Sequence, residues 1–385
     1  MPLPDGTIYA DHAATTPMHP DVLAAMLPYF SERFGNPSSV HRLGRQALNA
    51  LDSAHETVAK QLGCRPTEVV FTGGGSEADN LAIKGVAYAQ KRRGNHIITS
   101  SVEHHAVLHT CQQLEKEGYR VTYLPVDAAG RVSPADVAAA ITDETALVTL
   151  MYANNEVGTV QPVAEIGRLC RERKVPFHTD AVQANLLDLD VAALQVDLLT
   201  LSAHKFYGPK GVGILYVRQG TRIQPQTLGG SQERNRRAGT ENIPGAVGAA
   251  VALERIRAGR EAEAARLQAL QDTLATALLA IPGARLTGHP AERVPGSVSL
   301  TFPGVEGESL LIGLDDRGIC ASAGSACSSG EIEPSHVLTA MGLTAGDSRG
   351  HLRLTLGETT TEADVAAIAT AVPQVLESLR ALATR

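Results

Sequence analysis

The spacing of apolar residues changes repeatedly along the first half of the chain. Short runs that are apolar throughout are typical of buried strands, and they alternate with longer stretches whose apolar residues recur at helical spacing. The predicted strands lie at 68–72, 96–99, 121–125, 146–152 and 176–179, and predicted helices cover 38–62 or begin at 76, 105, 134 and 162. Such alternation predicts an α/β fold with a mostly parallel central sheet and helices on both faces. In this architecture ligands bind at the carboxyl ends of the strands.

Two further predicted strands flank Lys205. An apolar run at 197–201 precedes the lysine, and a Gly-Pro turn with a second apolar run at 211–217 follows it. A lysine at the end of a buried strand can be partly desolvated, so its amine can form a Schiff base with an aldehyde. A surface lysine in a connecting loop would give the same local pattern, so this stretch alone leaves both interpretations open.

The last third of the chain has a different pattern. An alanine-rich, charged stretch from about 246 to 279 predicts one long helix that links two parts of the molecule. Beyond it, predicted strands lie at 298–302, 318–321 and 351–356, and predicted helices begin at 308, 334 and 362. These elements predict a smaller α+β unit, and 385 residues exceed what one core usually holds.

Composition and charge exclude several classes of protein. Hydrophobic residues make up 43% of the chain and charged residues 19%, as in a globular protein. The net charge of -7 and the lack of a basic run give no sign of a nucleic-acid or phospholipid partner. The N-terminal residues do not resemble a signal peptide, and no apolar run approaches the ~20 residues of a membrane-spanning helix. We therefore expect a cytoplasmic protein without a membrane partner.

The cysteines fit the same picture. There are five, an odd number, and they are scattered without a CxxC pair, as expected for a reduced protein without a disulfide framework or structural zinc site.

A glycine-rich turn leads from the strand at 68–72 into the next helix. Gly73, Gly74 and Gly75 precede Ser76, whose hydroxyl could join the backbone amides of the helix N-terminus in binding a phosphate. The motif is neither GxGxxG nor a P-loop, so neither a dinucleotide nor ATP is favoured. A turn without any ligand would have the same pattern.

Polar side chains follow two other strands. The imidazole of His104 could stack on a flat heteroaromatic ring and exchange protons near neutral pH. Asp180 ends a buried strand, where a carboxylate needs a cation or a donor such as a protonated pyridine nitrogen. Gln183 would project from nearly the same side of the chain.

A metal site is the alternative interpretation of these residues. His104, His105, His178 and Asp180 are of ligand types that bind transition metals. The sequence has no tight ligand spacing such as HExxH among them, which favours the first interpretation.

Two further candidates lie near the C-terminus. Cys327 is in a loop of Gly, Ala and Ser residues, where a thiol has little to pack against and should be accessible as a nucleophile. Arg353 lies inside a predicted strand on the face opposite to its leucines, and its guanidinium could bind the carboxylate of an amino acid. A solvated surface arginine would fit the local pattern equally well.

Together these motifs resemble the cysteine desulfurases of the NifS/IscS kind, which are pyridoxal-phosphate (PLP) enzymes of the class V aminotransferase family and of PLP fold type I. The similarity runs along nearly the whole chain. It rests on residues 11–17, 35–39 with His41, 71–80, 103–105, 154–158, 178–183, 202–205, 237–242 and 324–328. Two departures are mild: His12 stands where relatives often have Asn or Tyr, and Gly75-Ser76 stands where Ala-Thr is common.

The resemblance implies the domain organisation and the cofactor site. It implies a large PLP-binding domain at 14–255 and a small domain of 1–13 and 256–385, with a mobile catalytic cysteine loop at about 321–332. Lys205 would bind the PLP aldehyde and move the α-proton of the substrate, and His104 would stack on the ring and assist proton transfer. The other implied cofactor contacts are Asp180 to the pyridine nitrogen, Gln183 to the phenolic oxygen, and Gly75, Ser76, Ser202 and His204 to the phosphate.

The resemblance also implies a homodimer with shared active sites, because Thr240 would reach the phosphate in the partner subunit. Asn154 and Arg353 would hold the substrate carboxylate, and Cys327 would be the catalytic nucleophile. The implied reaction converts L-cysteine to L-alanine and leaves a persulfide on Cys327. A sulfur acceptor, such as an iron–sulfur scaffold protein, would take this sulfur for iron–sulfur cluster or thio-cofactor synthesis. No permanent metal is expected, although Cys327 could ligate an iron–sulfur cluster transiently.

Other functions remain open on the sequence alone. A selenocysteine lyase or a class V aminotransferase would share the fold, and the aminotransferase would not need Cys327. The chain could also act mainly as a docking platform for sulfur transfer, or, under the metal interpretation, as a hydrolase.

Overall fold

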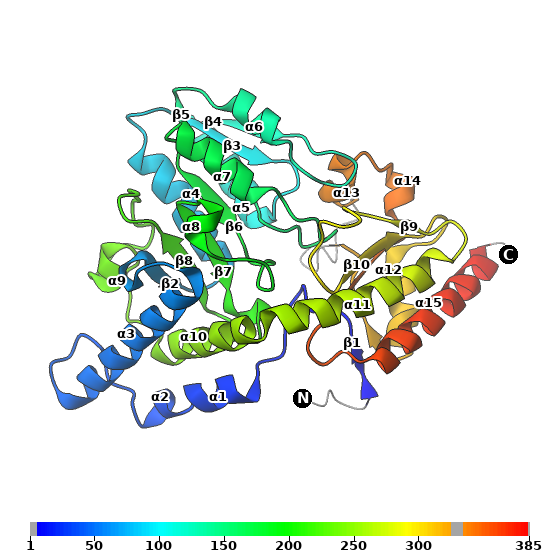
Figure 1. Ribbon diagram of the computed structural model, residues 1–385, viewed down its shortest axis with the longest axis horizontal. Helices are drawn as coiled ribbons and strands as arrows, with labels where there is room; N and C mark the ends of the chain where they lie inside the picture. The colour runs from blue at the N-terminus through cyan, green and yellow to red at the C-terminus, as the bar shows by residue number, and fades with distance from the viewer. Residues whose placement is uncertain (1–5, 325–333, 384–385) are drawn as a thin grey trace.

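Seven strands form the central sheet of the molecule (Figure 1). The computed structural model describes residues 6–324 and 334–383. In spatial order the strands are β2 (Val69–Thr72), β8 (Gly213–Val217), β7 (Leu198–Ser202), β6 (Phe177–Asp180), β5 (Thr145–Thr149), β3 (His96–Ser100) and β4 (Arg120–Leu124). All of them lie at or close to the positions predicted from the apolar runs.

The sheet is mostly parallel, as predicted, with β8 as the exception. Strands β7, β6, β5, β3 and β4 run parallel to one another, whereas β8 is antiparallel to both β2 and β7. Parallel neighbours need a crossover of about a dozen residues or more, and the connection from Ser202 to Gly213 is shorter than that. This short connection contains Lys205 in the 3-10 turn η3 (Ala203–Lys205), so the lysine is held directly at the carboxyl end of β7.

Helices cover both faces of the sheet, because alternate strand residues point to opposite sides. Leu198 and Leu215 pack into one apolar cluster with α4 (Gly75–Ala89) and α5 (His105–Lys116), whereas Leu199 packs into the main core on the other face. The helices that contribute to that core include α3 (Arg42–Leu62), α7 (Val163–Glu172) and α10 (Ile243–Ala258). The shorter helical segments of this part are α1 (Pro20–Met26), α2 (Pro28–Ser31), η2 (Pro66–Glu68), α6 (Pro134–Ala140), α8 (Val191–Leu194) and α9 (Gln232–Asn235).

A second part of the fold is built mainly from the C-terminal third of the chain. Its strand β10 (Ser297–Thr301) pairs antiparallel with β12 (His351–Thr355) and with β9 (Arg285–Leu286). The first strand of the chain, β1 (Ile8–Tyr9), pairs with β11 (Ile319–Cys320). The helices here are α11 (Arg260–Leu279), α12 (Gly307–Asp315), α13 (His336–Ala340), α14 (Ala345–Ser348) and α15 (Glu362–Ala383). The N-terminal strand thus joins the C-terminal part; the predicted boundaries at 14 and 256 stay a prediction.

The last helix, α15, is long and apolar enough to cross a membrane by length and composition. This differs from the sequence expectation that no apolar run approaches that length. Val365, Ile368, Val372 and Leu376 are buried on one side of α15, which packs against α11 and α12. One apolar side turned inward is what a core helix of a globular protein shows, since a helix needs only a stripe of apolar residues to pack.

Two element predictions were wrong in detail. The helix expected from 246 to 279 is two helices, α10 and α11, because Gly259, a poor helix former, interrupts it with φ of -102° and ψ of 7°. The helix expected from residue 38 begins at Arg42, because the imidazole of His41 accepts the capping hydrogen bond from the Gly44 amide.

Candidate active site

A cavity of about 210 Å³ lies at the carboxyl ends of the central strands. It collects side chains from segments that are far apart in the sequence: the N-terminal residue of α4, the cap of α5, the ends of β6 and β7, and the strand β12 of the C-terminal part. The predicted site residues that line it are Gly75, Ser76, His104, Asp180, Gln183, Ser202, His204, Lys205 and Arg353.

The amine of Lys205 is held by the N-terminal segment of the chain. Its Nζ donates to the carbonyl oxygens of Ala13 and Ala14, the second at 2.8 Å. The backbone is fixed as well, since Asn185 donates from Nδ2 to the Lys205 carbonyl at 2.7 Å. Lys205 is therefore a half-buried lysine with a defined position, and the interpretation of a solvated loop lysine does not hold.

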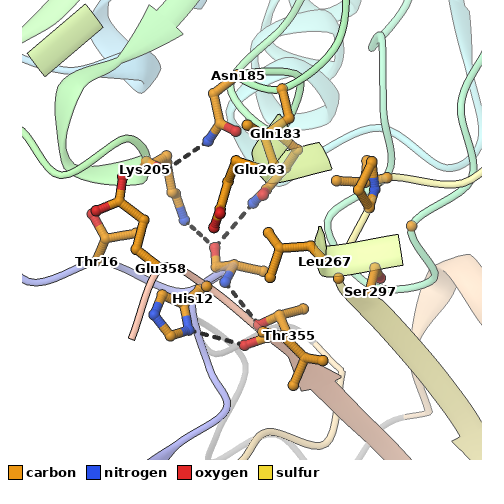
Figure 2. Close-up of a pocket in the computed structure, with 18 of the residues that line it drawn as sticks. His12, Thr16, Gln183, Asn185, Lys205, Glu263, Leu267, Ser297, Thr355 and Glu358 are labelled. Carbon is orange, nitrogen blue, oxygen red and sulfur yellow. Dashed lines mark hydrogen bonds between the residues drawn. The ribbon is translucent and has the colours of Figure 1, made fainter. Parts of the chain in front are cut away.

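Figure 2 shows the same lysine from an adjoining cavity, which shares Ala13, Asn155, Gln183 and Lys205 with the first. Gln183 donates from Nε2 to the Ala13 carbonyl at 2.9 Å, so Lys205 and Gln183 meet at one backbone oxygen. A single carbonyl thus aligns two side chains that the sequence had placed in the same site.

Asp180 is a buried carboxyl group whose ionised form a cationic ligand would stabilise. It is buried at the end of β6, and one oxygen accepts a hydrogen bond from the Val182 amide at 2.9 Å. Burial raises the pKa of Asp180 to about 6, although the Val182 hydrogen bond and the nearby Lys205 charge act in the opposite direction. A carboxyl with a pKa of about 6 is mostly ionised at pH 7, and a bound cationic ring nitrogen would stabilise this ionised form.

His104 caps α5 and is neutral at pH 7. Its Nδ1 accepts a hydrogen bond from the Ala106 amide at 3.1 Å, so the neutral ring carries its proton on Nε2. Burial, followed by the positive charge of Lys205 and of neighbouring histidines, lowers the pKa of His104 to about 4. A neutral imidazole can stack on a heteroaromatic ring and donate a hydrogen bond or a proton from Nε2.

The N-terminus of α4 forms a cradle for an anion. Gly74 has φ of +155°, a conformation that glycine adopts easily and other residues rarely do, and Gly75 begins the helix. A Cβ on Gly75 would lie 3.1 Å from Val182 and 3.3 Å from the Ser202 side chain. There is therefore little room for a larger residue at this position. Backbone amides at a helix N-terminus attract phosphate oxygens.

The side chains around this cradle suit the same ligand. Ser76 and Ser202 offer hydroxyl groups, and His204 is fixed by a contact of 3.1 Å between Nδ1 and Thr15 Oγ1. Burial lowers the pKa of His204 to about 4, so its ring is neutral and binds by hydrogen bonding.

Arg353 is fully buried, contrary to the surface arginine that its local pattern allowed. All five residues of β12 are buried, and backbone bridges join the strand to Asp11 of the N-terminal segment and to Ser322. Nη1 donates to the Asn155 carbonyl at 2.8 Å, and Nη2 forms an ion pair of 2.7 Å with Asp11. A buried guanidinium at the wall of a cavity is a typical carboxylate-binding group.

The structure does not bring Asn154 to this cavity. Its amide nitrogen donates to the Val102 carbonyl, and its oxygen accepts from the amides of Glu156 and Val157. These contacts use the side chain to shape the loop, and the adjacent Asn155 lines the cavity instead. The sequence offered two neighbouring asparagines and no periodicity to choose between them.

Thr240 and Cys327 are the remaining predicted site residues. Thr240 is exposed and lines a different hollow, near Thr72 and Gly73, not the cavity of its own chain. Cys327 lies outside the described residues.

Sequence reasoning missed two buried carboxyl groups beside the site. Asp79, on α4, lines the cavity, and its Oδ1 is 3.7 Å from His178 Nε2. Glu103 accepts from the Ser100 hydroxyl at 2.6 Å and from the Met151 amide at 3.0 Å, and burial raises its pKa to about 8. Their position next to helix starts was visible in the sequence, but nothing there showed that they face Asp180.

The metal interpretation finds no support in this geometry. In residues 6–324 and 334–383, no three His, Cys, Asp or Glu side chains are grouped so as to hold a metal ion. His178 is instead bonded between the hydroxyls of Thr149 at 2.8 Å and Thr200 at 3.0 Å within the sheet.

The residues of the cavity fit PLP. The cavity offers an amine for its aldehyde, a carboxyl for its ring nitrogen, a neutral imidazole for its ring face and a helix N-terminus for its phosphate. Together with the mostly parallel sheet, they define a PLP-dependent enzyme of fold type I.

Comparison with known proteins gives the family. Residues 8–368 match the aminotransferase class-V family, and the chain belongs to it. A cysteine desulfurase IscS of Methanosarcina thermophila is 51% identical over 374 residues, which cover 97% of this chain and 93% of that protein. The structure of a NifS-like protein aligns with a TM-score of 0.91 and 37% identity, covering 97% of this chain and 100% of that one. The structure of SspA in complex with cysteine aligns with a TM-score of 0.81 and 40% identity, covering 91% and 99%.

Proposed function

We propose that the chain is a PLP-dependent cysteine desulfurase that converts L-cysteine to L-alanine and transfers the sulfur to an acceptor. The observation that carries the proposal is the cavity that joins Lys205, Asp180 and His104 to the buried Arg353. It combines a cofactor site with a group for an amino-acid carboxylate. The names of the relatives, cysteine desulfurase and a cysteine complex, agree with that substrate.

In this proposal Lys205 anchors the cofactor and Asp180 pairs with its ring nitrogen. His104 stacks on the ring, Gln183 bonds the phenolic oxygen, and the α4 cradle with Ser76, Ser202 and His204 holds the phosphate. Bound there, PLP would accept the electron pair of the substrate Cα–H bond.

The chain supplies the substrate contacts and the proton transfers. Arg353 binds the α-carboxylate, with Asn155 rather than Asn154 beside it, because the side chain of Asn154 is used within its own loop. Lys205 takes the α-proton. His104 is placed to assist because it is neutral at pH 7.

Cys327 would carry out the sulfur transfer. Its thiolate attacks the substrate sulfur, an S–S bond forms, and the C–S bond breaks with its electron pair left on carbon. That carbon takes a proton, and the product is released as alanine while the persulfide stays on Cys327. An iron–sulfur scaffold or another acceptor then removes the outer sulfur; transient ligation of a cluster by Cys327 belongs to the same step.

The enzyme would be a homodimer with shared active sites, as the resemblance of the sequence to cysteine desulfurases implies. Six of the ten large apolar side chains exposed on the described residues fall between residues 23 and 48: Leu23, Leu27, Phe30, Phe34, Val40 and Leu48. Such a concentration favours a protein interface. Thr240 is exposed and does not reach the cavity of its own chain, which supports a role in the partner's phosphate site. We also propose a cytoplasmic location, in keeping with the composition.

The test is alanine release from L-cysteine by the PLP-loaded enzyme, with and without a sulfur acceptor. Lys205→Ala should lose the visible absorption band of lysine-bound cofactor, and Cys327→Ser should keep that band but form no persulfide. Persulfide on the Cys327→Ser protein would contradict the nucleophile assignment. Amino-group transfer to a keto acid without sulfur release would point to an aminotransferase, and turnover of selenocysteine alone to a selenocysteine lyase.

A further inference from the structure

The three nitrogen atoms of the Arg353 guanidinium have different surroundings. Nη1 is bonded to the Asn155 carbonyl, Nη2 is paired with Asp11, and the buried Nε has no hydrogen-bond partner among the described residues. The Arg353 side chain is 2% exposed and that of Asp11 is 17% exposed. The carboxylate of Asp11 is therefore paired with the arginine that lines the proposed substrate cavity.

A carboxylate binds a guanidinium best through two parallel hydrogen bonds. Nη1 is occupied by the backbone, so the edge left for a two-point contact is formed by Nε and Nη2. Nε is buried and has no hydrogen-bond partner among the described residues, whereas Nη2 is paired with Asp11 at 2.7 Å. The Asp11 carboxylate at Nη2 therefore competes, by its contact and by its charge, with an α-carboxylate brought to this edge.

The backbone of Asp11 is held beside Arg353 by several contacts. Tyr9 donates its hydroxyl to the Asp11 carbonyl at 3.0 Å, and Asp11 forms a backbone bridge with Thr355 on β12. The next residue, His12, donates from its ring to the Thr355 carbonyl at 3.0 Å (Figure 2). With its backbone fixed, the Asp11 side chain can leave Nη2 by rotating and return when the ligand departs.

We propose that Asp11 is an internal competitor for the substrate carboxylate: it neutralises Arg353 in the free enzyme and is displaced from Nη2 when an amino acid binds. The inference rests on the proposed role of Arg353. It makes Asp11 a positioning residue that keeps the buried cation paired between turnovers, since an unpaired buried charge is strongly destabilising. The same pairing lowers the apparent affinity for carboxylate ligands, because only the fraction with a released Nη2 binds them.

Asp11→Asn tests the inference, since it removes the charge and keeps the shape. The probes are L-alanine and ethylamine, which is alanine without its carboxylate, and their dissociation constants for the PLP-loaded enzyme are measured by calorimetry and by cofactor absorbance. We expect L-alanine to bind Asp11→Asn about tenfold more tightly than wild type, with ethylamine binding unchanged. The thermal stabilisation by L-alanine should also be larger in the variant. Asp316→Asn, an exposed aspartate outside the site, is the matched control.

The outcomes distinguish a failure of the proposed function from a failure of the proposed role of Asp11. If wild type bound ethylamine as well as L-alanine, Arg353 would not be a carboxylate site and the proposed function itself would lose its support. If wild type preferred L-alanine but Asp11→Asn left that affinity unchanged or weakened it, only the role of Asp11 would be overturned.

A crystal structure of wild type with L-alanine provides a measurement that does not depend on how the variant folds. The ligand carboxylate should contact Nε and Nη2 of Arg353, and Asp11 should be beyond hydrogen-bond distance of Nη2. An intact Asp11–Arg353 contact beside a bound carboxylate would refute the inference.

Discussion

At the scale of single residues, burial sets the protonation of the site. Asp180, Asp79 and Glu103 are carboxyl groups gathered under the cavity, and burial raises the pKa of each. His104 and His204 are shifted the other way, because burial disfavours their charged form too. Asp79 and Glu103 are therefore shifted furthest toward their neutral forms, whereas Asp180, with a pKa of about 6, is mostly ionised at pH 7 and can pair with a cationic ligand.

Glu103 gives a pH-dependent prediction. Its pKa rises from 4.5 to about 8 on folding, so as pH increases the unfolded chain releases this proton first. The free energy of unfolding therefore falls as pH rises from about 5 to about 8 and stays lower above pH 8. Glu103→Gln keeps an oxygen for the Ser100 hydroxyl and the Met151 amide but cannot ionise. We expect it to raise the free energy of unfolding at pH 8.5 by roughly 2 to 5 kcal/mol and to have little effect at pH 5.

Urea denaturation across this pH range measures the effect. The exposed Glu308→Gln is the control, and it should leave the pH profile as in wild type. A Glu103→Gln profile parallel to that of wild type would show that Glu103 is not protonated in the folded protein.

At the scale of elements, the glycine-rich turn is shaped by the neighbouring strand. Gly213 on β8 pairs with Thr72 at the end of β2, and a Cβ there would lie 2.3 Å from the Gly74 carbonyl oxygen and 2.5 Å from Thr72 Oγ1. Both atoms belong to the turn that starts α4. The antiparallel pairing of β8, which the apolar pattern did not reveal, therefore sets the position of the proposed phosphate cradle.

Gly213→Ala should push this turn out of position. We expect the dissociation constant for PLP to rise at least about tenfold, since a misplaced helix N-terminus loses its phosphate contacts. Equilibrium dialysis or fluorescence titration of the cofactor-free protein measures it. The control is Gly259→Ala, between α10 and α11, where a Cβ meets nothing within 4 Å and φ is -102°. The control should be as stable as wild type or up to about 1 kcal/mol more stable, with unchanged PLP affinity.

At the scale of the whole molecule, the cavity forms where distant segments meet. The N-terminal segment crosses from β1, in the C-terminal part, to the carbonyls that hold Lys205, and β12 brings Arg353 to the same place. The two parts of the fold thus share one site, and the proposed dimer would add Thr240 from a second chain.

Shared sites predict complementation between two inactive variants. Lys205→Ala and Thr240→Ala each disable a different contribution to a site, so a mixed dimer has one site with both residues intact. Random mixing makes half of the dimers mixed, and we expect up to about one quarter of wild-type alanine release per subunit, where each variant alone is much weaker. Refolding or co-expression of the two variants with an activity assay tests this. Activity that stays at the sum of the separate variants would mean that Thr240 does not act across an interface.

The sequence alone determined the strands, the order of the motifs and the chemical types at the site, because apolar periodicity and turn residues are local properties. It also made Lys205, His104 and Asp180 candidate site residues, each marked by its place near the end of a predicted strand, and the three line one cavity. Only the tertiary structure decided that Arg353 is buried and paired with Asp11, that Asn155 rather than Asn154 faces the cavity, and that Asp79 and Glu103 lie near Asp180. These depend on contacts between residues as far apart as 11 and 353, and no local period records which distant segment covers a given face.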